Sequence, residues 1–262
     1  MQVEEQIDYL SDSIPASISV LFGAPSRNGD LLFNSAFCIQ KNRISNVYHK
    51  QELPNYGVFD EKRYFSSGNQ PFVFECQQTK IGVLICEDQW IEGPISKLCH
   101  LDVDIVISLN ASPFQTGKHQ ERLNICKNYA SEFEVSYIYV NMIGGQDEVV
   151  FDGNSFVLDS KGNLVKQLPE FIELSCLHTE DSLQSTEPIK LEKSIYSALV
   201  LATRDYIQKN SPYRGLLLYH GLGAGKTISS ISIANGLDDY RRINILLPFI
   251  CRFNIKNLSH IN

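Results

Sequence analysis

Residues 81–88 read Ile81-Gly82-Val83-Leu84-Ile85-Cys86-Glu87-Asp88, an apolar run that ends abruptly in a thiol followed by two carboxylates. Such a run, rich in Ile, Val and Leu and closed by polar residues, predicts a buried β-strand. Sites in open α/β folds gather at the carboxyl ends of strands, where Cys86 would stand. A single cysteine is more often an inert core residue. Its place at a strand end favours a nucleophile, and the acidic pair could order polar substrate groups.

The composition of the 262-residue chain is that of a globular protein, with 43% apolar residues for a core. A net charge of −7 argues against broad binding to nucleic acid or to an anionic membrane, and we find no basic patch. The seven cysteines include no C-x-x-C pair and no histidine at zinc-finger spacing, so we predict neither a metal site nor disulfides. The sequence has no apolar run of transmembrane length and an acidic amino terminus, so we expect a cytoplasmic protein without membrane contacts.

Short apolar runs separated by turn residues dominate the first two thirds of the chain and predict strands. They lie at residues 18–22, 31–39, 44–48, 72–74, 81–85, 103–109 and 135–140. Apolar residues at helical spacing predict a helix over about residues 118–134, and a strand–helix–strand order implies a parallel crossover. The turn at residues 159–162 predicts an antiparallel hairpin of residues 154–158 and 163–168. The sequence therefore predicts the α/β class, with a mixed sheet and helices.

The last third of the chain divides into three predicted parts. Residues 177–192 are polar and predict a linker. Residues 193–210 carry an amphipathic helix that Ser211-Pro212 ends. Residues 211–262 predict a small partial α/β unit, with a strand at 215–219, a glycine loop, a helix at 226–235 and a strand at 243–247.

Three long motifs resemble the nitrilase-type glutamine amidohydrolase domain of glutamine-dependent NAD synthetases. They are KQELPNYGVFDEKRYF at 50–65, GVLICEDQW at 82–90, and LNASPFQTGKHQER with YVNMIGGQDEVVFDG within 109–153. The resemblance covers residues 1–176, and the helix at 193–210 resembles the start of the synthetase domain. It implies an α-β-β-α sandwich that hydrolyses glutamine through a cysteine thioester, with no cofactor, and releases ammonia for NAD biosynthesis.

The resemblance assigns the catalytic roles to Cys86, Lys50 and Glu61. A free thiol has a pKa of about 8.5, so attack on an amide needs help with the proton. Cys86 matches the nucleophile and Lys50 the cation that stabilises the oxyanion, a contribution of roughly 3 kcal/mol. Glu61 matches a glutamate that orients the lysine. The alternatives are a solvated surface lysine and a surface acid paired with Lys62 or Arg63.

The resemblance also implies four substrate contacts and leaves the assembly open. Tyr56 and Glu87 match residues that hold glutamine, and Ser112 and Arg122 match positions that bind its α-amino and carboxylate groups. Arg122 has an alternative reading as a charge on a helix face. Nitrilase-type domains commonly form homo-oligomers, so a scaffold for assembly is a further reading.

The family's general base precedes the matching segment. It is a glutamate in a Pro-Glu turn at the end of the second strand, and this chain begins after it. Glu4 and Glu5 are the only glutamates upstream and are poor substitutes. We therefore expect an incomplete sandwich that lacks its first strands, with weak or no glutaminase activity and poor solubility from exposed edges.

A second motif, SPYRGLLLYHGLGAGKT at residues 211–227, predicts a Walker A loop. Backbone N–H groups and the lysine of such a loop bind phosphates, and the hydroxyl of Thr227 would reach Mg²⁺. Its nucleotide-binding residues are Gly221, Gly223, Gly225, Lys226 and Thr227. The segment 211–258 resembles superfamily 2 helicases of large DNA viruses, with His220 at the first glycine position and no hydrolysis machinery after it.

Two origins fit the junction between the amidase-like and the helicase-like segments, a true fusion and a chimeric or fragmentary reading frame, and we favour the second. The alternative function is an ATP- and Mg²⁺-binding module that carries an inert amidase-like domain.

Overall fold

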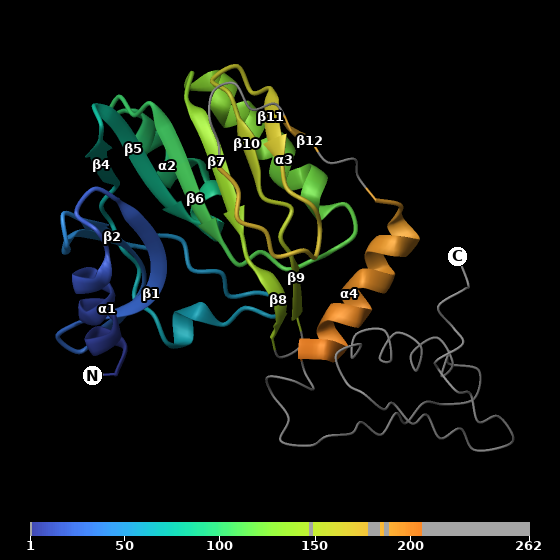
Figure 1. The fold of residues 1–262 in the computed structure, drawn as a ribbon, viewed down its shortest axis with the longest axis horizontal. Helices are drawn as coiled ribbons and strands as arrows, with labels where there is room; N and C mark the ends of the chain where they lie inside the picture. The colour runs from blue at the N-terminus through green and yellow to red at the C-terminus, as the bar shows by residue number, and fades with distance from the viewer. Residues whose placement is uncertain (1, 147–148, 178–183, 186–188, 206–262) are drawn as a thin grey trace, which may run out of the picture. The chain divides into compact units, whose positions relative to one another are not determined.

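The computed structural model describes residues 2–146, 149–177, 184–185 and 189–205 (Figure 1). The chain divides into two compact units, Met1–Ile143 with Phe151–Pro188 and Gly144–Val150 with Ile189–Asn262. The first unit holds most of the segments that resemble an amidase, and residues 144–150 of the third motif belong to the second unit. The predicted glycine loop with Gly221, Gly223, Gly225, Lys226 and Thr227, and the strands and helix around it, lie outside the described residues and stay predictions.

A three-stranded antiparallel sheet forms the first part of the larger unit. Its strands are β1 (Val20–Asn28), β2 (Leu31–Gln40) and β3 (Arg43–His49), in that order. The β2–β3 turn consists of Lys41 and Asn42, which both have positive φ, 51° and 58°. Two left-handed residues match the twist of the flanking strands in a two-residue hairpin. Helix α1 (Gln2–Ser13) packs against β1 and β3.

A seven-stranded mixed sheet forms the second part. Its order is β12 (Gln184–Ser185), β11 (Leu164–Gln167), β10 (Phe156–Leu158), β7 (Ser136–Asn141), β6 (Ile105–Asn110), β5 (Thr79–Ile85) and β4 (Phe72–Cys76). Strands β5, β6 and β7 are parallel, and helices α2 (Glu92–Cys99) and α3 (Lys118–Glu132) make the crossovers between them. The carboxyl ends of these three strands therefore meet at one edge, which brings the loops after Ile85, Asn110 and Asn141 together.

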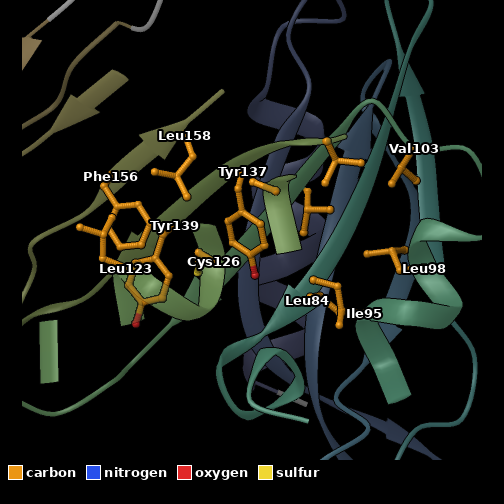
Figure 2. Close-up of a cluster of buried hydrophobic side chains, with 13 residues drawn as sticks. Leu84, Ile95, Leu98, Val103, Leu123, Cys126, Tyr137, Tyr139, Phe156 and Leu158 are labelled. Carbon is orange, nitrogen blue, oxygen red and sulfur yellow. The ribbon is translucent and has the colours of Figure 1, made fainter. Parts of the chain in front are cut away.

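The two faces of the larger sheet pack against different partners. On one face, Leu84 and Tyr137 join residues of α2 and α3, such as Leu98 and Cys126, in a buried cluster (Figure 2). On the other face, Val83 packs with Phe72 of the same sheet and with Cys38 and Tyr48 of the three-stranded sheet. The layers are helix, sheet, sheet, helix, so the predicted α-β-β-α sandwich is confirmed.

Most predicted elements are present, with shifted ends. The crossover helix, the parallel strands around it and the β10–β11 hairpin are confirmed. The first strand begins at Val20 instead of residue 18 and continues to Asn28, because its polar second half pairs with β2. Helix α2 and the hairpin of β8 (Ile143–Gln146) and β9 (Val149–Asp152) were not predicted.

The described part of the smaller unit contains one α-helix. Helix α4 (Leu191–Asp205) overlaps the helix predicted at 193–210 and begins two residues earlier. The Asp205 carboxylate accepts a hydrogen bond of 2.8 Å from the backbone N–H of Gly145. No helix in the described ranges is long and apolar enough to cross a membrane.

Candidate active site

Cys86 stands at the carboxyl end of β5 in a strained conformation. Its φ is 44°, in the left-handed region that residues with a Cβ rarely adopt. The residue ends the strand and begins a short 3₁₀ helix, Cys86–Gln89. Strain of this kind concentrates at functional sites, because the surrounding structure must hold it. The predicted strand-end position of the thiol is therefore present.

The thiol is partly buried, and its charged neighbours act on it in opposite directions. Burial raises the pKa of Cys86 to about 11, the positive charge of Lys50 lowers it, and the charges of Glu87 and Glu61 raise it. A hydrogen bond from the backbone of Ala111, in the loop after β6, also lowers the pKa of the thiol. The structure thus brings the three predicted catalytic residues within electrostatic reach of one another.

Lys50 is a buried residue at the end of β3, not a solvated surface lysine. Its Nζ donates to Oε1 of Glu61 at 2.7 Å, with 2% of the lysine side chain and 18% of the glutamate exposed. Asn34 Nδ2 donates to the other oxygen of Glu61 at 3.4 Å. The backbone of Lys50 is held on both sides, since its N–H donates to the carbonyl of Asn34 and its carbonyl accepts from Gly68. The lysine is thereby fixed at both its backbone and its ammonium group.

Tyr56 and Glu87 meet beside the thiol. The Tyr56 hydroxyl donates to Oε1 of Glu87 at 2.8 Å, and the tyrosine side chain is largely exposed. Burial and the hydrogen bond to Glu87 raise the pKa of Tyr56 to about 12. Both residues predicted to hold the substrate therefore lie together where a solute can reach them.

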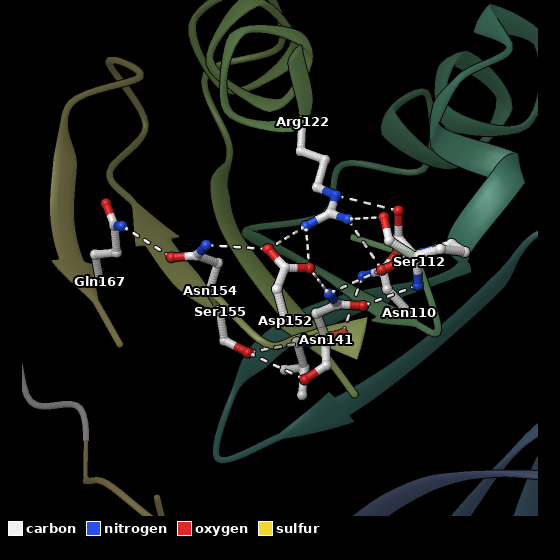
Figure 3. Close-up of polar contacts among 10 residues, drawn as sticks. Asn110, Ser112, Arg122, Asn141, Asp152, Asn154, Ser155 and Gln167 are labelled. Atoms are coloured by element: carbon white, nitrogen blue, oxygen red, sulfur yellow. Dashed lines mark hydrogen bonds and ion pairs between the residues drawn. The ribbon is translucent and has the colours of Figure 1, made fainter. Parts of the chain in front are cut away.

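Arg122 and Ser112 belong to a buried polar network (Figure 3). The Nη1 atom of Arg122 donates to both carboxylate oxygens of Asp152 at 2.9 and 3.1 Å. Nε donates to the Ser112 hydroxyl, and Nη2 donates to the carbonyls of Ser112 and Pro113. All three guanidinium nitrogens thus serve protein acceptors, and only 1% of Arg122 is exposed. A substrate contact of Ser112 or Arg122 stays a prediction.

Two residues of this region were missed in the sequence. Asp152 is the buried partner of Arg122, and it precedes Gly153, whose φ of 69° marks a tight turn. Lys118 begins α3, and its Nζ lies 3.9 Å from the centroid of the Trp90 ring. Lys118 also pairs with Glu121 at 3.0 Å and keeps 28% of its side chain exposed. Lys118 stands in the same sequence motif as Ser112, and this position was the signal in the sequence that could have indicated a second cation in this region.

Across the described ranges, no cluster of three or more His, Cys, Asp or Glu side chains is arranged to hold a metal ion. Cys86, Lys50 and Glu61 bring together a thiol, a fixed cation and a carboxylate that holds the cation. Such a set serves covalent catalysis on a carbonyl carbon, in which the cation stabilises the negative charge that develops on oxygen.

This fold and this site define the carbon-nitrogen hydrolase class. A profile of that family matches residues 15–186, and the chain belongs to the carbon-nitrogen hydrolase family.

Several similar proteins carry the name glutamine-dependent NAD(+) synthetase. A glutamine-dependent NAD(+) synthetase of Acinetobacter baylyi is 35% identical over 237 residues, which are 87% of this chain and 43% of that protein. One from a Synechocystis strain is 33% identical over 274 residues, 94% of this chain and 49% of that protein. The solved structure of glutamine-dependent NAD+ synthetase from Acinetobacter baumannii in complex with adenosine diphosphate aligns with a TM-score of 0.73 and 38% identity. It covers 79% of this chain and 40% of that one. The chain spans less than half the length of these relatives.

Proposed function

We propose that the chain is the glutamine-hydrolysing part of a glutamine-dependent NAD synthetase, which releases ammonia for the amidation step of NAD biosynthesis. The observation that carries the proposal is the buried Lys50–Glu61 pair whose charges act on the strand-end thiol of Cys86. The names of the relatives support glutamine as the substrate.

The reaction follows from the three side chains. The sulfur of Cys86 bonds to the amide carbon of glutamine, and the ammonium of Lys50 stabilises the negative charge on the carbonyl oxygen. The C–N bond then breaks, and the thiol proton leaves with the nitrogen as ammonia. Water hydrolyses the thioester to glutamate and frees the thiol. Glu61 holds Lys50 in place throughout, because a carboxylate at 2.7 Å fixes the position of the ammonium.

Partly exposed side chains around Cys86 offer partners of opposite charge to the α-ammonium and α-carboxylate groups of glutamine. Glu87 with Tyr56 suits the α-ammonium of glutamine, since the carboxylate is opposite in charge and is held by a hydrogen bond. We assign the α-carboxylate to Lys118, because it reaches solvent beside Trp90 while all guanidinium nitrogens of Arg122 are used. Ser112 offers a hydroxyl in the same loop.

Turnover by this chain is proposed to be slow. A thiol with a pKa of about 11 is almost entirely protonated at neutral pH, so attack requires a base near Cys86. The two carboxylates whose charges act on the thiol, Glu61 and Glu87, are engaged by Lys50 and Tyr56. Neither is available as an unpaired base.

The test is the release of glutamate and ammonia from glutamine by the purified chain, with Cys86→Ala as the control. The proposal predicts slow release that the Cys86→Ala change abolishes. Release that continues unchanged in the variant would refute the assignment of the nucleophile.

A second proposal concerns residues 211–227, whose predicted strand, glycine-rich sequence and Gly-Lys-Thr ending favour binding of ATP with Mg²⁺. It rests on the sequence pattern alone. Calorimetry with ATP and Mg²⁺ should show binding that Lys226→Ala abolishes, and identical heats for both proteins would refute it.

A further inference from the structure

Asp88 is a fully buried carboxylate that collects four hydrogen bonds. One oxygen, Oδ1, accepts the backbone N–H groups of Gln51 at 3.0 Å and Glu52 at 2.8 Å. The other, Oδ2, accepts the N–H of Ile85 at 3.0 Å and the hydroxyl of Tyr48 at 2.8 Å. Its exposed fraction is 0%. The carboxylate thus accepts from two parts of the chain, residues 48–52 and the end of β5.

The donors flank the two central residues of the site. Gln51 and Glu52 directly follow Lys50, and Ile85 directly precedes Cys86. Asp88 therefore joins the segment that carries the ammonium to the turn that carries the thiol. Among the described residues, Asp88 is the carboxylate that accepts backbone N–H groups from both of these segments.

The carboxylate is expensive to bury. Burial raises the pKa of Asp88 to about 6, while the N–H groups of Glu52 and Ile85 and the charge of Lys50 lower it. Within the described ranges Asp88 forms no salt bridge. An apolar side chain would fill the space at a lower desolvation cost, so the use of the carboxylate lies in the donors that it orders.

We propose that Asp88 is a positioning residue that holds the ammonium of Lys50 at working distance from the thiol of Cys86. The assignment rests on the proposed function, in which these two groups share the reaction. It adds a residue that does not touch the substrate and acts through the two that do.

A positioning role and a purely electrostatic role of Asp88 predict opposite changes in the pKa of the Cys86 thiol when Asp88 is removed. If Asp88 acted only through its charge, its removal would lower the pKa of Cys86, because an anion would be lost. If Asp88 acts by holding Lys50, its removal lets the cation move away, and the pKa of the thiol rises. The sign of the change therefore separates the two roles.

Asp88→Asn is the informative change because it keeps the shape and one acceptor. The single amide oxygen can serve Gln51 and Glu52 or it can serve Ile85, and the amide NH₂ then faces backbone donors on the other side. The link between the segments breaks while the volume is kept. The matched control is Asp159→Asn, which changes a turn carboxylate that also accepts two backbone N–H groups, those of Lys161 and Asn163.

The experiment measures alkylation of Cys86 by iodoacetamide between pH 8 and 9.5 on the full chain, by mass spectrometry of its peptide. We expect Asp88→Asn to slow alkylation about tenfold, one unit of thiol pKa, while Asp159→Asn changes nothing. In a Lys50→Met background, Asp88→Asn should not slow the alkylation of Cys86 further, because a residue that acts through the lysine has no effect on the rate once the lysine is absent. Faster alkylation, an unchanged rate, or an additive loss in the double variant would overturn the proposal.

Tyr48→Phe keeps the test decisive if Asp88→Asn does not fold. It removes one of the four bonds and should slow alkylation about threefold with a cooperative melt. An unchanged rate in Tyr48→Phe would then overturn the proposal. Iodoacetamide reacts with Cys86 without any recognition of glutamine. If the variants show the predicted alkylation rates but glutamine does not protect Cys86 from alkylation, the proposed function is refuted and the role of Asp88 stands.

Discussion

The ammonium of Lys50 and the carboxylate of Glu61 form a 2.7 Å ion pair that is almost entirely inside the protein. Exposed pairs of this kind contribute little, whereas a buried pair demands good geometry and leaves a costly charge when one partner is removed. The cation is thus held where its charge acts on the thiol of Cys86.

Lys50→Met should reduce Cys86-dependent glutamine hydrolysis by about 10²–10³-fold, the usual cost of losing one oxyanion donor. It should also raise the pKa of the thiol, because the charge that lowers it is gone. Glutamate release and the alkylation rate of Cys86 measure the two effects. Lys80→Met, an exposed lysine on β5, is the control and should change neither. A loss of similar size in the control would contradict the role of Lys50.

Alkylation of Cys86 should accelerate about tenfold per pH unit between pH 7 and 10, since only the thiolate reacts. The sign follows from burial, which raises the pKa of the thiol to about 11 and keeps the thiolate fraction low until that pH is approached. Mass spectrometry of the Cys86 peptide over a pH series provides the rates. A plateau already below pH 8 would show a thiol with a lowered pKa and contradict the prediction.

Arg122→Met should destabilise the fold by about 3–5 kcal/mol, because Asp152 would be left as a buried, unpaired charge. Urea denaturation measures the change. Arg63→Met removes the exposed pair of Arg63 with Asp60 and should leave the midpoint nearly unchanged. If Arg122→Met unfolded at the wild-type midpoint but no longer recognised glutamine, Arg122 would be a substrate ligand instead of a structural one.

Lys118→Met should weaken glutamine recognition about tenfold and leave the stability nearly unchanged, since the lysine is partly exposed. The measured quantity is the glutamine concentration that halves the alkylation rate of Cys86. Lys118→Arg retains the cation and should restore most of the protection. Equal protection in the wild type and in Lys118→Met would remove Lys118 from the site.

The fold could be predicted where local pattern and burial agree. The run of residues 81–85 has the length and composition of a buried strand, and it is β5. The helix α3 shows its buried face in Leu123, Cys126 and Ala130. Helix α2 has only eight residues, so its apolar positions are too few to show a period.

The site could be predicted in its residues but not in its connections. Lys50 and Cys86 stand in motifs, yet the sequence alone cannot show that Asp88 joins them, because its donors come from residues far apart in the chain. Arg122 likewise finds Asp152 only through the fold, and the motif alone favoured a substrate contact. Both contacts join residues far apart in the sequence, so only the fold shows them, and a substrate contact of Arg122 stays a prediction.

Covalent trapping tests directly whether Cys86 is the nucleophile that attacks glutamine. The purified chain is treated with a chloroketone analogue of glutamine, with and without excess glutamine, and the adduct is mapped by mass spectrometry. We predict a single adduct, on Cys86, whose formation glutamine suppresses and Lys50→Met slows. An adduct spread over several cysteines, or one on Cys86 that glutamine does not suppress, would contradict it.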